Sequence, residues 1–372
     1  MSVLLQDILS IMEELAPRQL AESWDNPGLL VGNPNQPVES ILFALDVTEE
    51  NVEYAVQHGI HVIISHHPFI FKKLSAVRTD TWQGRVLEKL IKHDIAVFAA
   101  HTNWDIAGGG VNDILAEAIG LQDIRGLYKT GKEPLCKLVV YVPESHARIV
   151  RHVLGEAGAG HIGNYSHCLF SAKGIGQFKP LEGTRPFIGK IGKIEEVEEV
   201  RIETVVPKSE VNKVLERVRE VHPYEEIAYD IYELSQEYRS YALGRIGRLK
   251  QAMTAKELSM EIKKALGLSH IAVAGEENTR VYTVAVCGGA GAEFAGAAKQ
   301  AGAQYYLTGD VKYHEAQAAV WQGLVIADGG HFGTEFLAVQ ALKRAVEEKI
   351  KERGWEVQTA ADETAADIWQ HW

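Results

Sequence analysis

The chain has 372 residues, of which 46% are hydrophobic and 24% are charged, and its formal net charge is −12. That length suggests two or three domains, and an acidic balance without a Lys/Arg-rich stripe disfavours a nucleic-acid-binding protein. Cys136, Cys168 and Cys287 form no CxxC pair, which argues against a disulfide framework and a cysteine-based zinc site and fits a reducing cytoplasm. The N-terminal segment predicts an amphipathic helix ending at Pro17 rather than a signal peptide, and no apolar run reaches the ~18 to 20 residues of a membrane span.

Residues 1–127 alternate the patterns of buried strands and helices. The apolar runs predict strands at 41–46, 62–64 and 95–100, and the segments between and after them predict helices at 49–58, 81–93 and 111–119. Thr48 is expected to cap the first of these helices. Continuous apolar strands separated by helices indicate a sheet that is covered on both faces.

Residues 128–240 have a different pattern of predicted strands and helices. Val142-Pro143-Glu144-Ser145 is matched by Val206-Pro207-Lys208-Ser209, each time between a strand pattern and a helix pattern. Two such units in tandem predict a ferredoxin-like α+β insertion, although chance similarity of two strand-to-helix junctions is the alternative. The acidic segment 193–200 is expected to be a solvated connection.

From residue 241 to 372 the alternation of predicted strands and helices resumes. Thr254 and Glu257 form a capping box for a helix that reaches Leu266. Strands are predicted at 281–287, 305–307 and 324–327, followed by a helix at 334–352. We therefore predict a layered α/β core of two similar halves, 1–127 plus 241–372, interrupted by an insertion in a surface loop.

Three of the predicted strands are followed by side chains of the kinds that bind metals. They are His66 and His67 after the second strand, Asp105 after the third, and His331 with Glu335 after the last. Open α/β sheets bind ligands just beyond the carboxyl ends of their strands, and His, Asp and Glu are the ligands of hydrolytic metal sites. Because successive strand side chains alternate in direction, adjacent histidines suit two neighbouring ions better than one. Each motif alone is more often structural; the three together predict a metal site.

Other residues near strand ends allow two interpretations each. Asp310 and His314 follow the strand 305–307 and are candidates for a proton shuttle or for residues that orient a ligand. Capping of the next helix by Asp310 is an alternative of equal weight. His101 is a candidate for orienting a ligand by a hydrogen bond. The glycine-rich loop 287–291 fits a phosphate site or simply a tight turn. Neither GxxxxGK[ST] nor GxSxG is present in the sequence.

Two further motifs are more ambiguous. Ser23-Trp24-Asp25-Asn26-Pro27-Gly28 has the composition of a turn, and a role in lining a pocket is the alternative. His222-Pro223-Tyr224-Glu225-Glu226 contains a histidine and two carboxylates that could hold a metal, but a corner between a helix and a strand is the stronger interpretation.

These motifs resemble the GTP cyclohydrolase I type 2 homologue family, also called the NGG-one-interacting-factor-three-like family. The resemblance covers 1–127 and 241–372 and rests on SWDNPGL (23–29), SHHP (65–68), HTNWD (101–105), TGD (308–310) with His314, and GHFGTE (330–335). It implies that two divalent metal ions per chain are held by His66, His67, Asp105, His331 and Glu335, with Glu335 bridging. It also implies a toroidal homohexamer and a PII/CutA-like insertion that forms trimer contacts, HPYEEIAYDIY (222–232) resembling its CutA-like strand.

Two functions follow from this resemblance and from the residues. The first is a metal-dependent hydrolase like GTP cyclohydrolase I type 2, acting on a nucleotide or related small molecule, with Asp310 or His314 as candidate proton shuttle. The alternative is a non-catalytic, metal-dependent regulatory or binding protein whose insertion is a sensor or assembly domain. Ligands without thiolate fit Zn²⁺, Fe²⁺, Mn²⁺ or Co²⁺. A DNA-associated factor conflicts with the acidic charge, so we expect a cytoplasmic homo-oligomer without nucleic-acid or membrane partners.

Overall fold

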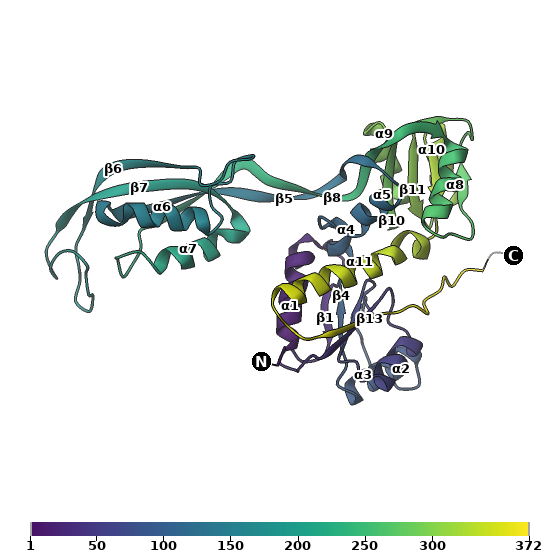
Figure 1. Ribbon diagram of the computed structural model, residues 1–372, viewed down its shortest axis with the longest axis horizontal. Helices are drawn as coiled ribbons and strands as arrows, with labels where there is room; N and C mark the ends of the chain where they lie inside the picture. The colour runs from purple at the N-terminus through teal and green to yellow at the C-terminus, as the bar shows by residue number, and fades with distance from the viewer. Residues whose placement is uncertain (1, 371–372) are drawn as a thin grey trace. The chain divides into compact units, whose positions relative to one another are not determined.

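The computed structural model describes residues 2–370 and has the mixed α/β architecture that the sequence predicts (Figure 1). Two sheets and eleven α-helices lie in the described part of the chain. The chain divides into two compact units: Met1–Thr130 with Tyr241–Trp372, here called the core unit, and Gly131–Ser240, here called the insert unit. No helix within residues 2–370 is long and apolar enough to cross a membrane.

The first sheet of the core unit is built mainly from buried parallel strands. From edge to edge it contains β1 (Gly28–Val31), β4 (Ala96–Ala99), β3 (Val62–Ser65), β2 (Ser40–Ala44) and β13 (Gln358–Ala361). Only β1 is antiparallel to its neighbour. Every residue of β2, β3 and β4 is buried, as expected for a sheet that is covered on both faces.

Helices cover both faces of this sheet. On one face α1 (Leu5–Leu15) buries Leu5, Ile8, Ile11 and Met12 against the strands. On the other face lie α2 (Glu49–Gln57) and α3 (Trp82–Lys92). Thr48 caps α2 by accepting a hydrogen bond from the backbone N–H of Asn51, as the sequence predicts.

The second sheet of the core unit follows a similar plan. This sheet has eight strands in all, and its part within the core unit contains, in order, β8 (Tyr229–Thr254), β10 (Arg280–Ala290), β11 (Tyr305–Gly309), β12 (Val325–Asp328) and β9 (Ala272–Ala274) at the edge. The middle three strands are parallel, whereas β8 and β9 are antiparallel to their neighbours. The helices that accompany it are α8 (Ala255–Ala265), which begins at the predicted Thr254–Glu257 capping box, α9 (Ala295–Gln300) and α10 (Tyr313–Trp321).

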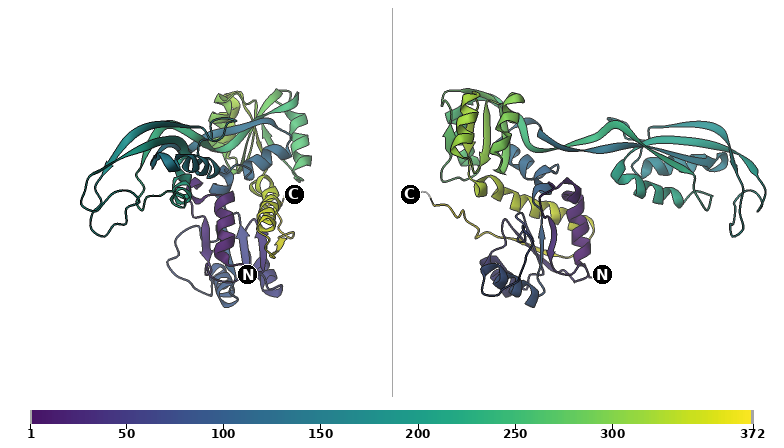
Figure 2. Two further views of the ribbon diagram at one scale, coloured as in Figure 1. Left: turned by 60° about the vertical axis from the view of Figure 1, so that its left-hand side comes forward. Right: turned by 180° about the vertical axis from the view of Figure 1, so that it is seen from behind.

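The helix α11 (His331–Glu352) joins the two halves of the core unit (Figures 1 and 2). It packs against β2 and β13 of the first sheet and against β10 and β11 of the second. Along its length Val339, Leu342 and Val346 enter the apolar core of the first sheet, while Leu337 packs against that of the second. This helix therefore carries its first turn to a place where the ends of strands from both sheets meet. The short α4 (Thr102–Ile106) and α5 (Val111–Ala118) lie against each other, and α5 also packs against α11 and β10.

The insert unit has the element order β-α-β-β-α-β. Its elements are the distal part of β5 (Gln122–Pro143), α6 (Ala147–Glu156), β6 (Leu169–Phe178), β7 (Glu195–Pro207), α7 (Val211–Arg219) and the first part of β8. The strands lie in the order β6-β7-β5-β8. That element order is the one a ferredoxin-like unit has; the PII/CutA-like character of the insertion stays a prediction.

One sequence prediction of local structure is wrong. The acidic segment 193–200, expected to be a connection, supplies the first part of β7, which pairs with β6 from Glu195 onward. The last long helix begins at His331, close to its predicted start near Thr334. There Gly330 adopts a φ of +77° immediately before the helix, and the Thr334 hydroxyl donates to the Gly330 carbonyl.

Candidate metal centre

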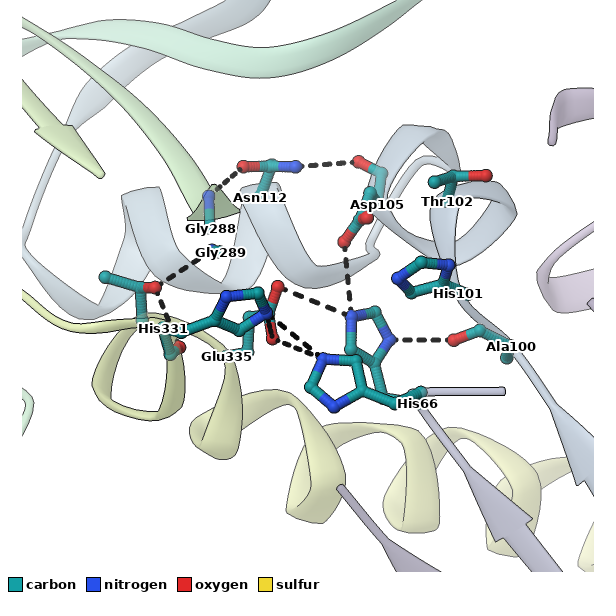
Figure 3. A network of polar contacts seen from close by, with 12 residues as sticks. His66, Ala100, His101, Thr102, Asp105, Asn112, Gly288, Gly289, His331 and Glu335 are labelled. Atoms are coloured by element: carbon teal, nitrogen blue, oxygen red, sulfur yellow. Dashed lines mark hydrogen bonds and ion pairs between the residues drawn. The ribbon is translucent and has the colours of Figure 1, made fainter. Parts of the chain in front are cut away.

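The five residues predicted as metal ligands converge in the core unit. His66 and His67 follow β3, and Asp105 lies in α4. His331 is the first residue of α11, and Glu335 lies one turn further along it. In Figure 3 the rings of His66 and His331 and the carboxylates of Asp105 and Glu335 point toward one another. His66, Asp105 and Glu335 are buried, with 4%, 8% and 3% of their surface exposed. Carboxylate and imidazole groups that are buried together need partners that neutralise their charge and satisfy their polar atoms.

The ligand atoms form two groups that share Glu335. In the first group, His66 Nε2 lies 3.6 Å from Glu335 Oε1 and 3.7 Å from Asp105 Oδ1. In the second group, Glu335 Oε2 lies 3.0 Å from His67 Nε2 and 3.1 Å from His331 Nε2, and the two nitrogens are 3.3 Å apart. Each oxygen of one carboxylate thus faces a different group, and each group could hold a metal ion.

These separations suit metal ligation. Zinc binds imidazole nitrogen and carboxylate oxygen at about 2.0 to 2.2 Å, so two ligands at a tetrahedral angle lie roughly 3.4 Å apart. The distances in the two groups, 3.0 to 3.7 Å, bracket that value. Moreover, His66 Nε2 and Asp105 Oδ1 are buried without a hydrogen-bond partner. Buried polar atoms are normally paired, and a cation between these two atoms would satisfy both.

The orientation of the histidines also suits ligation. His66 Nδ1–H donates to the backbone carbonyl of Ala100 at 2.8 Å. His67 Nδ1–H donates to Asp46 Oδ1 at 2.8 Å, and His331 Nδ1–H donates to Asp310 Oδ2 at 2.7 Å. Metal-binding histidines typically donate their second ring N–H to a carboxylate or a backbone carbonyl in this way. The same bonds leave all three Nε2 atoms facing the centre.

The pKa values of these groups reflect their burial and their closeness to one another. Burial raises the pKa of Asp105 to about 7. Burial also opposes the charge on His67, but its hydrogen bonds to Asp46 and Glu335 outweigh this and raise the pKa of His67 to about 10. The hydrogen bond to Glu335 raises the pKa of His331 to about 9. Protons on the histidines thus partly substitute for cations in neutralising the buried carboxylates.

His101 is a fourth histidine at the centre, and its role differs from the predicted one. It does not orient a ligand; it is itself oriented by Asp25, whose Oδ1 accepts from His101 Nδ1–H at 2.8 Å. The Asp25 side chain is fully buried and also accepts from the Thr102 backbone N–H. Although burial opposes it, the hydrogen bonds from His101 and Thr102 lower the pKa of Asp25. The His101 ring lies 5.3 Å from that of His66 and 5.7 Å from that of His67, so its Nε2 adjoins the metal groups.

The glycine-rich segment 287–291, most of which forms the end of β10, packs directly behind Glu335. The backbone N–H of Gly288 donates to Asn112 Oδ1, whose amide group donates in turn to the Asp105 carbonyl (Figure 3). The N–H of Gly289 donates to Thr334 Oγ1. These two amides already donate hydrogen bonds within the protein, which argues against a phosphate site. The segment forms an irregular end of β10, whose pairing with β11 shifts between Val286 and Ala290. A Cβ atom on Gly289 would lie 2.2 Å from Glu335 Oε1, so only glycine allows the carboxylate its place.

The two predicted catalytic candidates differ in their surroundings. Asp310, with a φ of +54°, holds His331 through the hydrogen bond described above, which matches a residue that orients a ligand. His314 is exposed, and its ring contacts that of Tyr313. The sequence did not single out Asp46, which holds His67 and follows β2; its place at the end of a buried strand was the available signal.

Two histidine motifs of the insert unit lie outside this centre. His222 is buried and uses both ring nitrogens, one with the Tyr141 carbonyl and one with the backbone N–H of Tyr224. It is therefore part of a corner and does not present a free ligand atom. His152, Glu156 and His167 form an exposed group whose ligand atoms lie within 4.8 Å of one another.

The fold and the site together define an α/β protein with a buried centre of histidines and carboxylates that could hold metal ions. The family model described as Duf34/NIF3 (NGG1p interacting factor 3) matches residues 3–367. The chain therefore belongs to the DUF34/NIF3 family, and the resemblance seen in its motifs is confirmed.

Individual relatives support this membership. A protein named GTP cyclohydrolase 1 type 2 homolog from Halalkalibacterium halodurans is 46% identical over 97% of both chains. A Bacillus subtilis protein of the same name is 45% identical over 89% of both chains. Among solved structures, a Bacillus cereus protein related to NIF3 is 44% identical, with a TM-score of 0.94 over 100% of both chains.

Proposed function

We propose that this protein is a metal-dependent hydrolase with two divalent cations per chain. One cation is held by His66, Asp105 and Glu335, and the other by His67, His331 and Glu335. The observation that carries the proposal is the Glu335 carboxylate, which is buried and faces a different ligand group with each of its oxygens. Carboxylates and imidazoles without thiolate fit Zn²⁺, Fe²⁺, Mn²⁺ or Co²⁺.

A pair of divalent cations would supply acidification of water and stabilisation of negative charge on the reacting oxygens. The chain's own residues would do the remaining work. Asp105 and Glu335 bring two negative charges to the centre and offset the positive charge that two cations add. Asp46, Asp310 and the Ala100 carbonyl fix the ring orientation of the three ligand histidines.

His101 is the residue best placed to move a proton. Because Asp25 accepts from its Nδ1–H, the ring presents Nε2 as an acceptor toward the centre. The His101 side chain is 17% exposed, so it can pass a proton to solvent. A histidine held by a buried carboxylate is the usual arrangement of a general base. We therefore assign the proton transfer to His101 in place of His314.

The substrate proposed is a nucleotide or a related planar ring compound. Trp24 and Phe71, which are 60% and 45% exposed, lie with ring centroids 6.2 Å and 6.3 Å from that of His101. Exposed aromatic rings beside a reactive centre offer stacking faces for a heteroaromatic ring. The name of the relatives, GTP cyclohydrolase 1 type 2 homolog, points in the same direction. Hydrolysis would then open the ring at the carbon between two nitrogens.

The test is turnover of GTP and other purine nucleotides by protein loaded with Zn²⁺, Mn²⁺, Fe²⁺ or Co²⁺, followed by chromatography of the products. His101→Asn is expected to keep its metals and lose about 10² to 10⁴ in kcat, whereas His314→Asn should keep both metals and turnover. Full metal occupancy without turnover of any nucleotide would refute this substrate class and favour the non-catalytic binding function. The homohexamer with trimer contacts through the insertion stays a prediction, which light scattering would check.

A further inference from the structure

The sheet of the insert unit has one face covered by helices and one face that is not. Val140, Val142, Val200 and Ile202 are buried against α6 and α7. Because side chains alternate along a strand, Tyr141 on β5 and Glu199 on β7 lie on the opposite face. Each is one residue away from a buried valine in its strand.

A cavity of about 320 Å³ lies over this second face. The side chains that give it its chemical character are aromatic or acidic: Tyr141, Phe178, Phe187, Tyr224, Glu199 and Glu225. They come from β5, β6, β7, the loop between β6 and β7, and the corner after α7. The cavity is thus formed within the insert unit alone and is separate from the metal centre.

The corner motif noted in the sequence holds one wall of this cavity in place. His222 Nε2–H donates to the Tyr141 carbonyl at 3.0 Å, and His222 Nδ1 accepts from the Tyr224 backbone N–H at 3.2 Å. The Tyr224 hydroxyl donates to Glu199 Oε1 at 2.8 Å. The Tyr224 ring is also close to two other rings, with centroids 5.9 Å from Phe178 and 6.5 Å from Phe187. The Glu199 carboxylate and these three aromatic rings therefore line the same cavity, and Tyr224 links them.

The charge in the cavity has a single sign. Its described lining includes Glu199, Glu225 and Glu226 but no lysine or arginine. Glu225 accepts a hydrogen bond from the Arg185 backbone N–H, whereas Glu199 Oε2 has no hydrogen-bond partner among the described residues. A Cβ atom on Gly176 would lie 2.1 Å from Glu199 Oε2, so a glycine makes room for this oxygen.

We propose that this cavity binds a small organic ammonium ion, with Glu199 as its counter-charge and Phe178, Phe187 and Tyr224 as its aromatic walls. The negative faces of aromatic rings attract cations, and cages of such rings recognise alkylated ammonium groups. A carboxylate beside the rings adds charge complementarity and rejects anions such as phosphates. The insert unit would then be a site for a cationic small molecule, independent of any turnover at the metal centre.

The experiment compares choline with 3,3-dimethylbutan-1-ol, which has the same shape without the charge. Binding of each to the full-length protein is measured by calorimetry. We expect one choline per chain, bound roughly tenfold more tightly than the neutral alcohol. Absence of choline binding, or equal binding of the two compounds, would overturn the proposal.

Matched variants locate the binding. Glu199→Gln should abolish the preference for choline, while Glu182→Gln, which removes the same charge from an exposed position outside the cavity lining, should leave it intact. Circular dichroism and the metal content of each variant show whether it folds. A preference that survives in folded Glu199→Gln, or that disappears equally in both variants, would also overturn the proposal.

Discussion

Replacing Gly289 by alanine tests how closely the end of β10 determines the position of Glu335. The new Cβ would lie 2.2 Å from Glu335 Oε1 and 3.2 Å from His331 Nε2. A normal contact requires the carboxylate oxygen to move by about 1 Å, whereas metal–ligand distances tolerate only about 0.2 Å. We therefore expect the two metals to lose their shared ligand.

Gly289→Ala is expected to change two quantities, the folding free energy and the metal affinity. Alanine at a φ of +61° costs about 1 to 2 kcal/mol of folding free energy because its Cβ crowds the backbone. Displacing a group that positions metal ligands costs at least 10- to 100-fold in metal affinity. The first change should appear in denaturant unfolding of the metal-free protein, and the second in competition of the bound metal with a chelator.

Gly59→Ala is the matched control. Gly59 has a φ of +62° with no atom within 4 Å of the position of a Cβ, so alanine there brings the same backbone strain without the contact. We expect it to lose similar folding stability and to bind metal as the wild type does. Wild-type metal affinity in folded Gly289→Ala would refute the reasoning about Glu335.

Three other predictions concern the same centre. Asp46→Asn should weaken metal binding by about 10- to 100-fold, because Asp46 fixes the ring of His67; unchanged affinity in a chelator competition would contradict this. Metal binding at pH 7 should release protons, and affinity should rise with pH, since His67 and His331 have pKa values of about 10 and 9 in the metal-free protein. The raised pKa values also stabilise the metal-free fold: the stabilisation is complete below the ordinary histidine pKa of about 6.5 and is lost as pH rises through 9 to 10. Calorimetry of metal binding in buffers of different ionisation enthalpy counts the protons released. Release of no protons would refute the assignment of these pKa values. Trp24→Ala should raise KM for a purine nucleotide more than it lowers kcat, and an unchanged KM would remove Trp24 from the binding site.

Local signals explain why much of the fold was predictable. Thr48 and Thr254 cap their helices through side-chain hydrogen bonds that depend only on nearby residues. The continuous apolar runs before His66, His101 and Asp328 form buried parallel strands because such strands have no polar face. The convergence of His66, His67 and Asp105 followed from the rule that strand ends of a parallel sheet share one edge. His331 and Glu335 follow β12 of the other sheet and reach the same place through α11, which packs against both sheets.

Features that depend on distant partners were not predictable. The pairing of His101 with Asp25 joins residues 76 positions apart, and neither sequence neighbourhood shows the contact. The acidic start of β7 became a strand because β6 pairs with it and its glutamates lie partly on the face without helices. The need for glycine at 289 is set by Glu335, 46 positions later, whose side chain reaches it only through the packing of α11.

The central claim, two metals that share Glu335, is tested most directly by counting metal ions per chain. Elemental analysis of protein saturated with Zn²⁺ and then desalted should be made in a His167→Ala background, which removes the exposed ligand group of the insert unit. The account predicts two ions per chain there and a marked loss on adding Glu335→Ala. One ion or none per chain, or two ions that persist in the folded Glu335→Ala protein, would contradict it.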